Sequence, residues 1–283
     1  MNDVSSGSMA TFKEVEISSL GNLLDQATPQ QCDPVSGRRR VNAIYRGVAD
    51  TRWSLLTSLD RLGGPEPPHT KAHLEEHILR NFMRYARPFL QQPNTNHWEL
   101  LVTAQHHGAP TRLLDWTFSP LIAAHFATLR GQPDCDRVIW RLDWLALHEH
   151  FRLKPLAFLV SDLDEALQSH GYASAWDLFN SEREGKPFVC MLEPPALDAR
   201  ILAQSAAFTL ASVKTMGLDQ ILEQNALTQC LTRFIIRAEK VDFIRDQLDL
   251  CGIDERKIFP DIDGVAAEIA RYYSASGGDS NPR

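Results

Sequence analysis

The sequence predicts an α+β fold, built as a single compact domain with a small mixed or antiparallel sheet flanked by helices. Short apolar or alternating segments of strand type are interspersed with amphipathic segments of helix type. These segments do not follow the regular strand–helix–strand order of a doubly wound parallel sheet. The chain has 283 residues, of which 43% are hydrophobic, and this is enough to form one complete core.

Four segments have the composition of strands. The segment 41–47 ends at a glycine, and 137–142 alternates apolar and polar side chains. The segments 188–192 and 231–238 are mainly apolar, and the latter is rich in Phe and Ile. The stretch 111–118 has neither pattern, so we expect it to be irregular.

The longest helix is expected over about 71–90. Its apolar residues recur at spacings of three and four, which predicts one buried face. That face consists of Leu74, Ile78, Phe82, Tyr85 and Phe89.

The other expected helices have recognisable ends. A helix over about 97–107 stops before Gly108. Ser119 and Pro120 form an N-cap and first-turn pair that opens an apolar helix. A helix over about 240–251 stops at Gly252, and a last helix follows Pro260.

We expect one domain over residues 11–273. Residues 1–10 and 274–283 are small and polar and are expected to be disordered ends. Between them there is no internal repeat, and the Gly- and Pro-rich loop at 63–68 is too short to separate two domains.

Composition excludes several classes of protein. With 29 Lys and Arg against 36 Asp and Glu, the net charge is −7, which argues against a broad surface for extended duplex nucleic acid. No stretch approaches 18 uninterrupted apolar residues, so we expect no membrane partner. The N-terminus lacks the basic and apolar regions of a secretory signal, and the five cysteines are scattered without CxxC spacing. We therefore expect a reducing, cytoplasmic setting.

The densest group of chemically useful side chains lies at 105–120, between two expected helices. A polar loop held on a rigid scaffold is a common place for a binding or catalytic site. The alternative is a capping segment, in which Arg112 pairs with Asp115 and the hydroxyl groups cap the next helix.

A second candidate is Tyr45-Arg46-Gly47, at the end of the first expected strand. The planar guanidinium of Arg46 can bind a phosphate while the glycine lets the main chain approach closely. The alternative is an arginine salt-bridged at a strand end.

Metal binding and thiol catalysis are not expected. His69, His73 and His77 recur every four residues, but the glutamates of His-Leu-Glu-Glu-His occupy the wrong positions for a zinc protease and no third ligand follows. Cys190 and Cys230 lie in or beside apolar strands, as inert core thiols do.

Together these segments resemble the FRG domain family, named for a Phe-Arg-Gly motif near its start. Here the motif is Tyr45-Arg46-Gly47, within the block 45–61. The strongest similarity is Gln105-His106-His107-Gly108 with Thr111–Thr117, continued by Ala123–Ala127. Later blocks at 200–204 with 208–209, and at 252–253 with 258–264, extend the resemblance over about residues 11–270.

The order of these motifs also resembles that of ADP-ribosyltransferases of the Arg-Ser-Glu class, which implies a related fold and NAD as the substrate. Arg46 matches the arginine and Thr117-Phe118-Ser119 the Ser-Thr-Ser element, while Gln204 occupies the late motif where the family has a carboxylate. The implied catalytic residues are Arg46, Thr117 and Gln204, and the implied substrate-binding residues are Tyr45, Gly47, Gln105, His106, Arg112, Asp115, Trp116 and Ser119. Arg46 and Arg112 are expected to build a small positive cleft that holds one dinucleotide, with no metal.

Besides NAD cleavage, two other functions stay open, namely sensing and RNA cleavage. Proteins with FRG domains are often associated with bacterial anti-phage defence and toxin systems, so the chain is expected to be an NAD-using effector or a non-catalytic module that senses a nucleotide or a phage component. An amide at Gln204 stabilises positive charge less well than a carboxylate, which favours sensing. The third, RNA cleavage by His106 or His107 with Arg112, ranks last because adjacent residues on a helix point about 100° apart. The macromolecular acceptor is not specified by the sequence.

Overall fold

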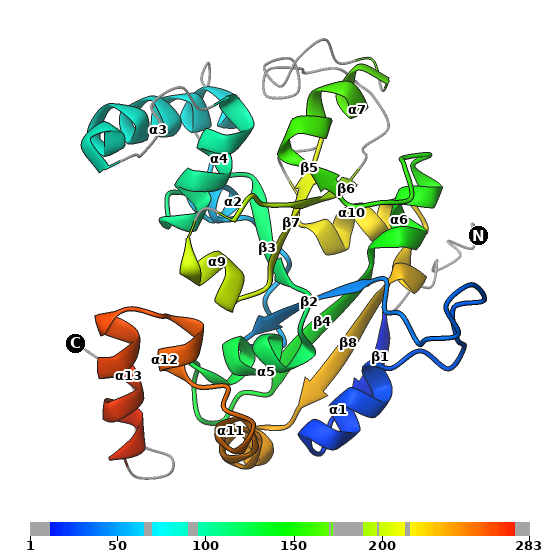
Figure 1. The fold of residues 1–283 in the computed structure, drawn as a ribbon, viewed down its shortest axis with the longest axis vertical. Coiled ribbons are helices and arrows are strands. Elements are labelled where there is room, and N and C mark those ends of the chain that lie inside the picture. Colours follow the sequence, from blue (N-terminus) through cyan, green and yellow to red (C-terminus); the bar gives the residue numbers. More distant parts are fainter. Residues whose placement is uncertain are drawn as a thin grey trace, which may run out of the picture.

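The computed structural model describes residues 12–64, 70–89, 96–169, 171, 189–196, 198–212 and 216–274. Within these residues, eight strands form one mixed sheet in the order β1-β8-β4-β2-β3-β7-β6-β5 (Figure 1). The two outermost pairs, β1 with β8 and β5 with β6, are parallel, and all other pairs are antiparallel. The predicted α+β class and mixed sheet are confirmed, although the sheet is larger than expected.

The strands are short and come from the whole described chain. They are β1 (Lys13–Glu16), β2 (Ala43–Val48), β3 (Leu113–Thr117), β4 (Arg137–Asp143), β5 (Phe158–Leu159), β6 (Val189–Glu193), β7 (Ala206–Ala211) and β8 (Leu231–Ile236). Strands were predicted at the positions of β2, β4, β6 and β8, and these predictions are confirmed.

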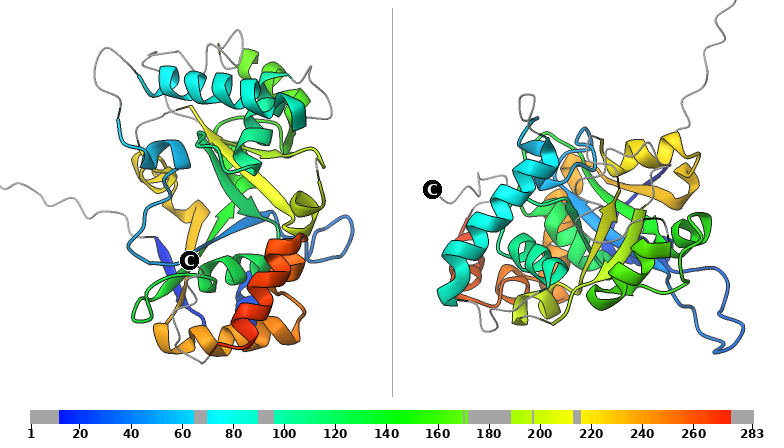
Figure 2. Two further views of the ribbon diagram at one scale, coloured as in Figure 1. Left: turned by 90° about the vertical axis from the view of Figure 1, so that its left-hand side faces the viewer. Right: turned by 90° about the horizontal axis from the view of Figure 1, so that it is seen from above.

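The helices cover both faces of the sheet (Figures 1 and 2). The α-helices are α1 (Leu20–Ala27), α2 (Ser58–Arg61), α3 (Lys71–Ala86), α4 (His97–His106), α5 (Pro120–Thr128), α6 (Trp144–His150), α7 (Leu163–Ser169), α9 (Ala199–Ala203), α10 (Leu218–Gln224), α11 (Val241–Leu250), α12 (Glu255–Ile258) and α13 (Ile262–Tyr272). The predicted caps are present: the Ser119 hydroxyl accepts from the Ile122 N–H, Gly108 and Gly252 end α4 and α11 with positive φ, and α13 follows Pro260.

The stretch 111–118 is not irregular, because residues 113–117 form β3 and pair along their full length with β7. The sequence pattern does not indicate a strand here because the polar Asp115 interrupts the apolar residues of the segment. Of the five residues of β3, only Asp115 is exposed. Leu114 and Trp116 are buried on one face of the sheet, while Asp115 on the other face is exposed.

The face of α3 also differs from the prediction. The helix buries Ala72, Glu75 and Leu79, whereas Tyr85 and Phe89 of the predicted apolar face are exposed. The buried face is displaced because it receives a charged pair, Glu75 with Arg112, described below. The ends of the chain expected to be disordered lie almost wholly outside the described residues.

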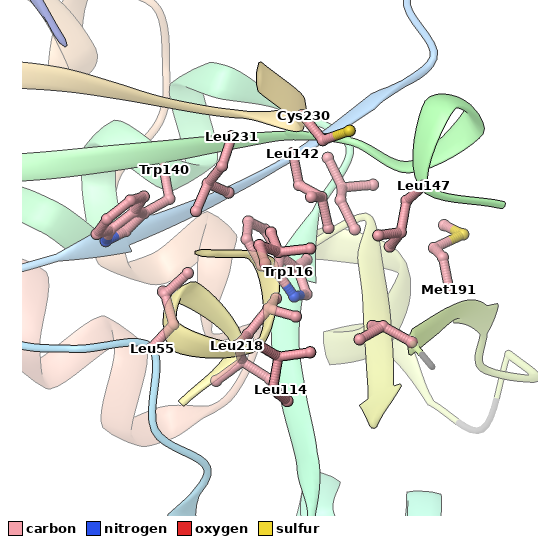
Figure 3. Close-up of a cluster of buried hydrophobic side chains, with 14 of the residues drawn as sticks. Leu55, Leu114, Trp116, Trp140, Leu142, Leu147, Met191, Leu218, Cys230 and Leu231 are labelled. Atoms are coloured by element: carbon pink, nitrogen blue, oxygen red, sulfur yellow. The ribbon is translucent and has the colours of Figure 1, made fainter. Parts of the chain in front are cut away.

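One face of the sheet carries a single continuous core, which we call the central core. It contains residues of β2, β3, β4, β6, β7 and β8, and α6 and α10 cover it. Figure 3 shows Trp116 and Trp140 inside this cluster, together with Leu55 and Leu218. A large apolar face shared by most strands is the main hydrophobic stabilisation of the fold.

The opposite face carries two separate cores. The α3–α4 core packs these helices on β3, β6 and β7, and the α5–α11 core packs α1, α5 and α11 on β2, β4 and β8. Figures 1 and 2 place α3 and α4 at one end of the molecule and α11 at the other. The boundary between the two cores therefore lies where β2 meets β3.

At this boundary β2 and β3 separate, and we call this place the opening between β2 and β3. β2 and β3 pair at a single position, Tyr45 with Thr117, whereas β2 pairs with β4 over Ala43–Val48. Figure 1 shows the two strands running in different directions from their meeting point. Main-chain groups beyond that point must find other partners, because a buried N–H or C=O left unpaired is costly.

Gly47 fixes how closely β2 packs against α5. A Cβ atom at Gly47 would lie 1.9 Å from the Ala123 carbonyl oxygen and 2.5 Å from the Ala127 nitrogen. Only a residue without a side chain allows the strand and helix backbones to approach to this distance. The glycine of the Tyr-Arg-Gly motif is thus a packing residue.

A buried charged network joins α5 to the C-terminal helices. Glu255 of α12 accepts hydrogen bonds from Arg245 of α11 and from Arg271 of α13, and it is almost fully buried. The Nη1 of Arg245 lies 3.1 Å from Nδ1 of His125. Burial first, and the neighbouring Arg245 second, lower the pKa of His125 to about 4. His125 is therefore neutral near pH 7 and accepts a hydrogen bond from Arg245.

Gly47→Ala is expected to destabilise the protein by about 3 kcal/mol, because either α5 or β2 must move to accommodate the new methyl group. Urea unfolding followed by circular dichroism measures the change. The matched control is Gly64→Ala, since Gly64 has no atom within 4 Å of an added Cβ. Equal stability of the two variants would contradict the packing role of Gly47.

Stability is expected to fall on acidification between pH 6.5 and pH 4. In this range the unfolded chain protonates His125 at its ordinary pKa of 6.5, but the folded protein does not. The free energy of unfolding falls by up to about 3 kcal/mol over the range from this group alone. His125→Gln keeps an acceptor for Arg245 and lacks the titration, so its unfolding free energy should depend less steeply on pH. Parallel pH dependences of the two proteins would contradict this assignment.

Candidate functional site

The opening between β2 and β3 is filled by the side chain of Arg46. Its Nη1 donates a 2.6 Å hydrogen bond to the main-chain carbonyl of Asp115 and lies 3.5 Å from the Asp115 carboxylate. The guanidinium thus takes the place of a backbone donor that β2 no longer supplies. The Asp115 side chain is 55% exposed, so its carboxylate faces solvent beside a largely buried arginine.

Asp115 is held from its other side by α4. The Gln105 Nε2 group donates to both carboxylate oxygens, at 2.9 and 2.8 Å. The Gln105 Oε1 atom accepts a 2.5 Å hydrogen bond from the Thr111 hydroxyl, which orients the amide. Gln105 and Thr111 are buried, so the carboxylate is fixed before any ligand arrives.

The opening has an excess of positive charge. Burial lowers the pKa of the Arg46 guanidinium, Asp115 opposes this effect, and the nearby Arg61 of α2 lowers the pKa further by charge repulsion. Arg61 is exposed and donates to the Leu56 carbonyl. Among the described residues only Nη1 of Arg46 has a hydrogen-bond partner, so its other N–H groups are available to an anion.

Arg112 does not pair with Asp115. Its Nε donates a 2.7 Å hydrogen bond to Glu75 of α3, and its main-chain N–H donates to the other carboxylate oxygen at 2.8 Å. Arg112 is 4% exposed and Glu75 is fully buried. The Arg112–Asp115 pair of the capping alternative is therefore wrong because Glu75 is the partner, whereas the Ser119 cap that it also expected is present. Arg112 joins α3 to the start of β3.

His106, next to Gln105, lies 2.6 Å through Nε2 from the carboxylate of Asp198. Asp198 is also the N-cap of α9 and accepts from the Ile201 N–H. Burial raises the pKa of Asp198, but the hydrogen bonds from Ile201 and His106 outweigh it and lower the pKa below its usual value. His107 stacks on Phe82 instead. The two adjacent histidines thus face different partners.

The end of β3 contacts the end of α9. The Thr117 hydroxyl donates a 2.7 Å hydrogen bond to the Gln204 carbonyl and accepts one from the Ser119 N–H. The Gln204 side chain points to α12, where its Nε2 donates to the Ile258 carbonyl at 3.3 Å. Thr117, Ser119 and Gln204 are therefore neighbours, and the amide of Gln204 binds a protein carbonyl.

Three other residues of the predicted site lie elsewhere. Tyr45 is 1% exposed in the α5–α11 core, and Gly47 packs on α5, so both lie on the opposite side of β2 from Arg46. Trp116 is buried in the central core, where its indole N–H donates to the Thr209 hydroxyl at 2.9 Å (Figure 3). Neither ring is exposed as a platform for a ligand.

The residues that are brought together form a continuous chain of contacts. Arg46 contacts Asp115, and Asp115 binds Gln105 on α4. His106, which follows Gln105, binds Asp198 at the start of α9. At the other end of α9, the Gln204 carbonyl accepts a hydrogen bond from Thr117. Arg61, Thr111 and Asp198 belong to this arrangement but were not singled out as site residues. Arg61 and Thr111 lie inside the motif blocks, whereas Asp198 has only the signal of a helix N-cap.

Other chemical possibilities are limited. The described residues contain no group of three or more His, Cys, Asp or Glu side chains that could hold a metal ion, and His73 instead caps α3 with Thr70. Burial raises the pKa of Cys190 to about 12 and that of Cys230 to about 11, as predicted for inert core thiols. No helix in the described part of the chain is long and apolar enough to cross a membrane.

Glu75→Gln is expected to destabilise the protein by about 3 kcal/mol, because it removes the charge of the buried carboxylate that binds the buried Arg112 cation. Thermal or urea unfolding measures the change. The control is Glu76→Gln on the same helix, which is less buried and should change stability by less than about 0.5 kcal/mol. A stable Glu75→Gln protein would mean that Arg112 does not depend on this pair.

Comparisons with known proteins agree with the motifs at the opening. Residues 41–136 match the family model of the FRG domain. This range includes Tyr45-Arg46-Gly47 and the 105–117 block, and extends from β2 to the approach to β4. No curated protein and no solved structure matches the chain. The chain therefore contains an FRG domain, matched over residues 41–136.

Proposed function

We propose that this FRG-domain protein is an ADP-ribosyltransferase-like effector that binds and cleaves NAD at the opening between β2 and β3. The association of FRG domains with anti-phage defence and toxin systems supports a role of that kind in a bacterial cell. The observation on which the proposal depends is the pairing of Arg46 with the exposed carboxylate of Asp115.

Arg46 and Arg61 are suited to the diphosphate of the dinucleotide. The free N–H groups of Arg46 match the geometry of phosphate oxygens, and a bidentate guanidinium fixes a ligand's orientation as well as its position. Two arginines and one carboxylate act on each other here and leave a net positive charge at the opening. A ligand with two adjacent negative charges balances this group better than a neutral one does.

Asp115 supplies the carboxylate that the late motif lacks. When the bond between ribose C1′ and nicotinamide breaks, its electron pair goes to the neutral leaving ring and positive charge develops on the ribose. A fixed carboxylate stabilises that charge. The acceptor's nucleophile then bonds to C1′, and its proton passes to Asp115. Gln105 and Thr111 hold the carboxylate in place, which limits reorganisation during the reaction.

The second candidate function is nucleotide sensing without turnover. It is favoured by Gln204, whose side chain is an amide and donates to the Ile258 carbonyl. In that case Arg46 binds the nucleotide, and Asp115 serves only to orient Arg46.

The two functions are separated by measuring NAD binding and NAD cleavage in the same protein. Arg46→Ala is expected to weaken NAD binding about tenfold or more, because a charge-assisted hydrogen bond is lost. Asp115→Asn keeps the size of the side chain but removes its charge, so the cleavage rate should fall about 100-fold with a much smaller change in affinity. Isothermal titration calorimetry and nicotinamide release provide the two measurements.

The control is Arg130→Ala, which removes an exposed arginine just after α5. It should leave both binding and cleavage unchanged. Binding that depends on Arg46, without cleavage by the unmodified protein in the presence of cell lysate and nucleic acid, would establish sensing in place of catalysis. Absence of NAD binding by the folded protein would overturn both functions.

A further inference from the structure

Helix α13 presents its apolar residues to solvent. Ile262, Val265, Ile269 and Tyr272 recur at spacings of three, four and three. Ile262 is 82% exposed, Ile269 50% and Tyr272 73%. Figures 1 and 2 show α13 at the outside of the molecule.

The side of α13 that faces the protein is small and polar. Gly264 packs so closely on α12 that a Cβ there would lie 1.9 Å from the Phe259 carbonyl oxygen. Arg271 points the same way and binds Asp249 and Glu255. An amphipathic helix normally buries its apolar stripe against the core. Here the attachment uses a glycine contact and ion pairs, so the apolar stripe does not hold the helix in place.

The spacing of the stripe specifies the shape of its partner. Apolar residues at alternating spacings of three and four form the seam by which one α-helix packs lengthwise on another. The helix has 11 residues and is about 16 Å long, so a partner helix of about three turns covers it. Exposed apolar side chains that form one continuous patch mark interaction sites more often than scattered ones do.

The edge of the seam specifies the partner's charge. Asp261 and Glu268 each come directly before an isoleucine of the seam, which is the position that faces the flank of a paired helix. Ala266 and Tyr273 occupy the other edge and are uncharged, and Arg271 is engaged with Asp249 and Glu255. In an antiparallel pair of two copies the acidic edges would meet and repel each other. A basic edge on the partner complements them.

We propose that α13 is a docking surface for a basic amphipathic helix of another protein. The apolar seam provides the buried contact, and Asp261 and Glu268 select a partner helix with Lys or Arg beside its own seam. Asp261 also caps α13 by accepting from the Gly264 N–H, so Glu268 is the position at which the charge preference is best tested.

The test uses the full chain and two synthetic 21-residue helical peptides with Leu and Ile at the seam positions. One peptide carries Lys at the edge positions and the other carries Glu. The Lys peptide is expected to bind with a dissociation constant on the order of 10 µM, and the Glu peptide at least tenfold more weakly. Fluorescence anisotropy of labelled peptide measures both, and a Lys peptide with a scrambled seam should not bind.

Two variants separate the seam from the edge. Ile269→Asp should reduce binding of the Lys peptide at least tenfold, whereas Glu268→Lys should weaken the Lys peptide and strengthen the Glu peptide. The matched control for the seam is Val35→Asp, which changes an exposed apolar residue in the loop between α1 and β2. Figure 1 shows α1 and α13 on opposite sides of the molecule. Circular dichroism checks that each variant is folded.

Three results would overturn the proposal. The first is equal affinity for the Lys and Glu peptides, and the second is binding that Ile269→Asp does not change. The third is a dimer, measured by sedimentation, that Ile269→Asp dissociates, since a second copy would then be what covers the seam.

Discussion

The contact of Arg46 with the Asp115 carbonyl is the interaction on which the arrangement of the site depends. It lies where the two halves of the sheet separate, so it replaces main-chain hydrogen bonding between β2 and β3. Gly47 lets β2 pack closely on α5, on the face of the strand opposite Arg46. Arg46 lies where β2 and β3 separate, and it supplies a contact between them.

The residues of the motif Tyr45-Arg46-Gly47 thus lie on two faces of β2 and have different roles. Tyr45 and Gly47 build the α5–α11 core, while Arg46 reaches the neighbouring strand. Strand alternation requires this division, since consecutive side chains point to opposite faces. A short motif of three residues can for this reason serve packing and ligand binding at once. The same holds in β3, where Asp115 is exposed between Leu114 and Trp116 of the central core.

Local patterns predicted four of the eight described strands and the five longest described helices, but few of the side-chain partners. The ends of α4, α5, α11 and α13 follow from caps and glycines that act within one helical turn. The strand β3 was missed because Asp115 interrupts its apolar residues, and its ladder partner β7 lies about 90 residues later in the chain. The partner of Arg112 could not be predicted either, since Glu75 looks like an ordinary helical glutamate until the fold buries it. The exposure of the apolar side of α13 depends on Gly264, whose close packing is also a property of the folded chain.

The acidic composition and the positive opening are compatible because they act at different ranges. Exposed charges more than about 8 Å apart are largely screened at physiological ionic strength. The net charge of −7 therefore governs encounters with large charged surfaces, whereas in the proposed function Arg46 and Arg61 act on a ligand at short range. Asp115 reduces this local charge without cancelling it. In the proposed function the opening therefore takes a compact anion with two adjacent charges, because the net charge of −7 disfavours the approach of an extended polyanion.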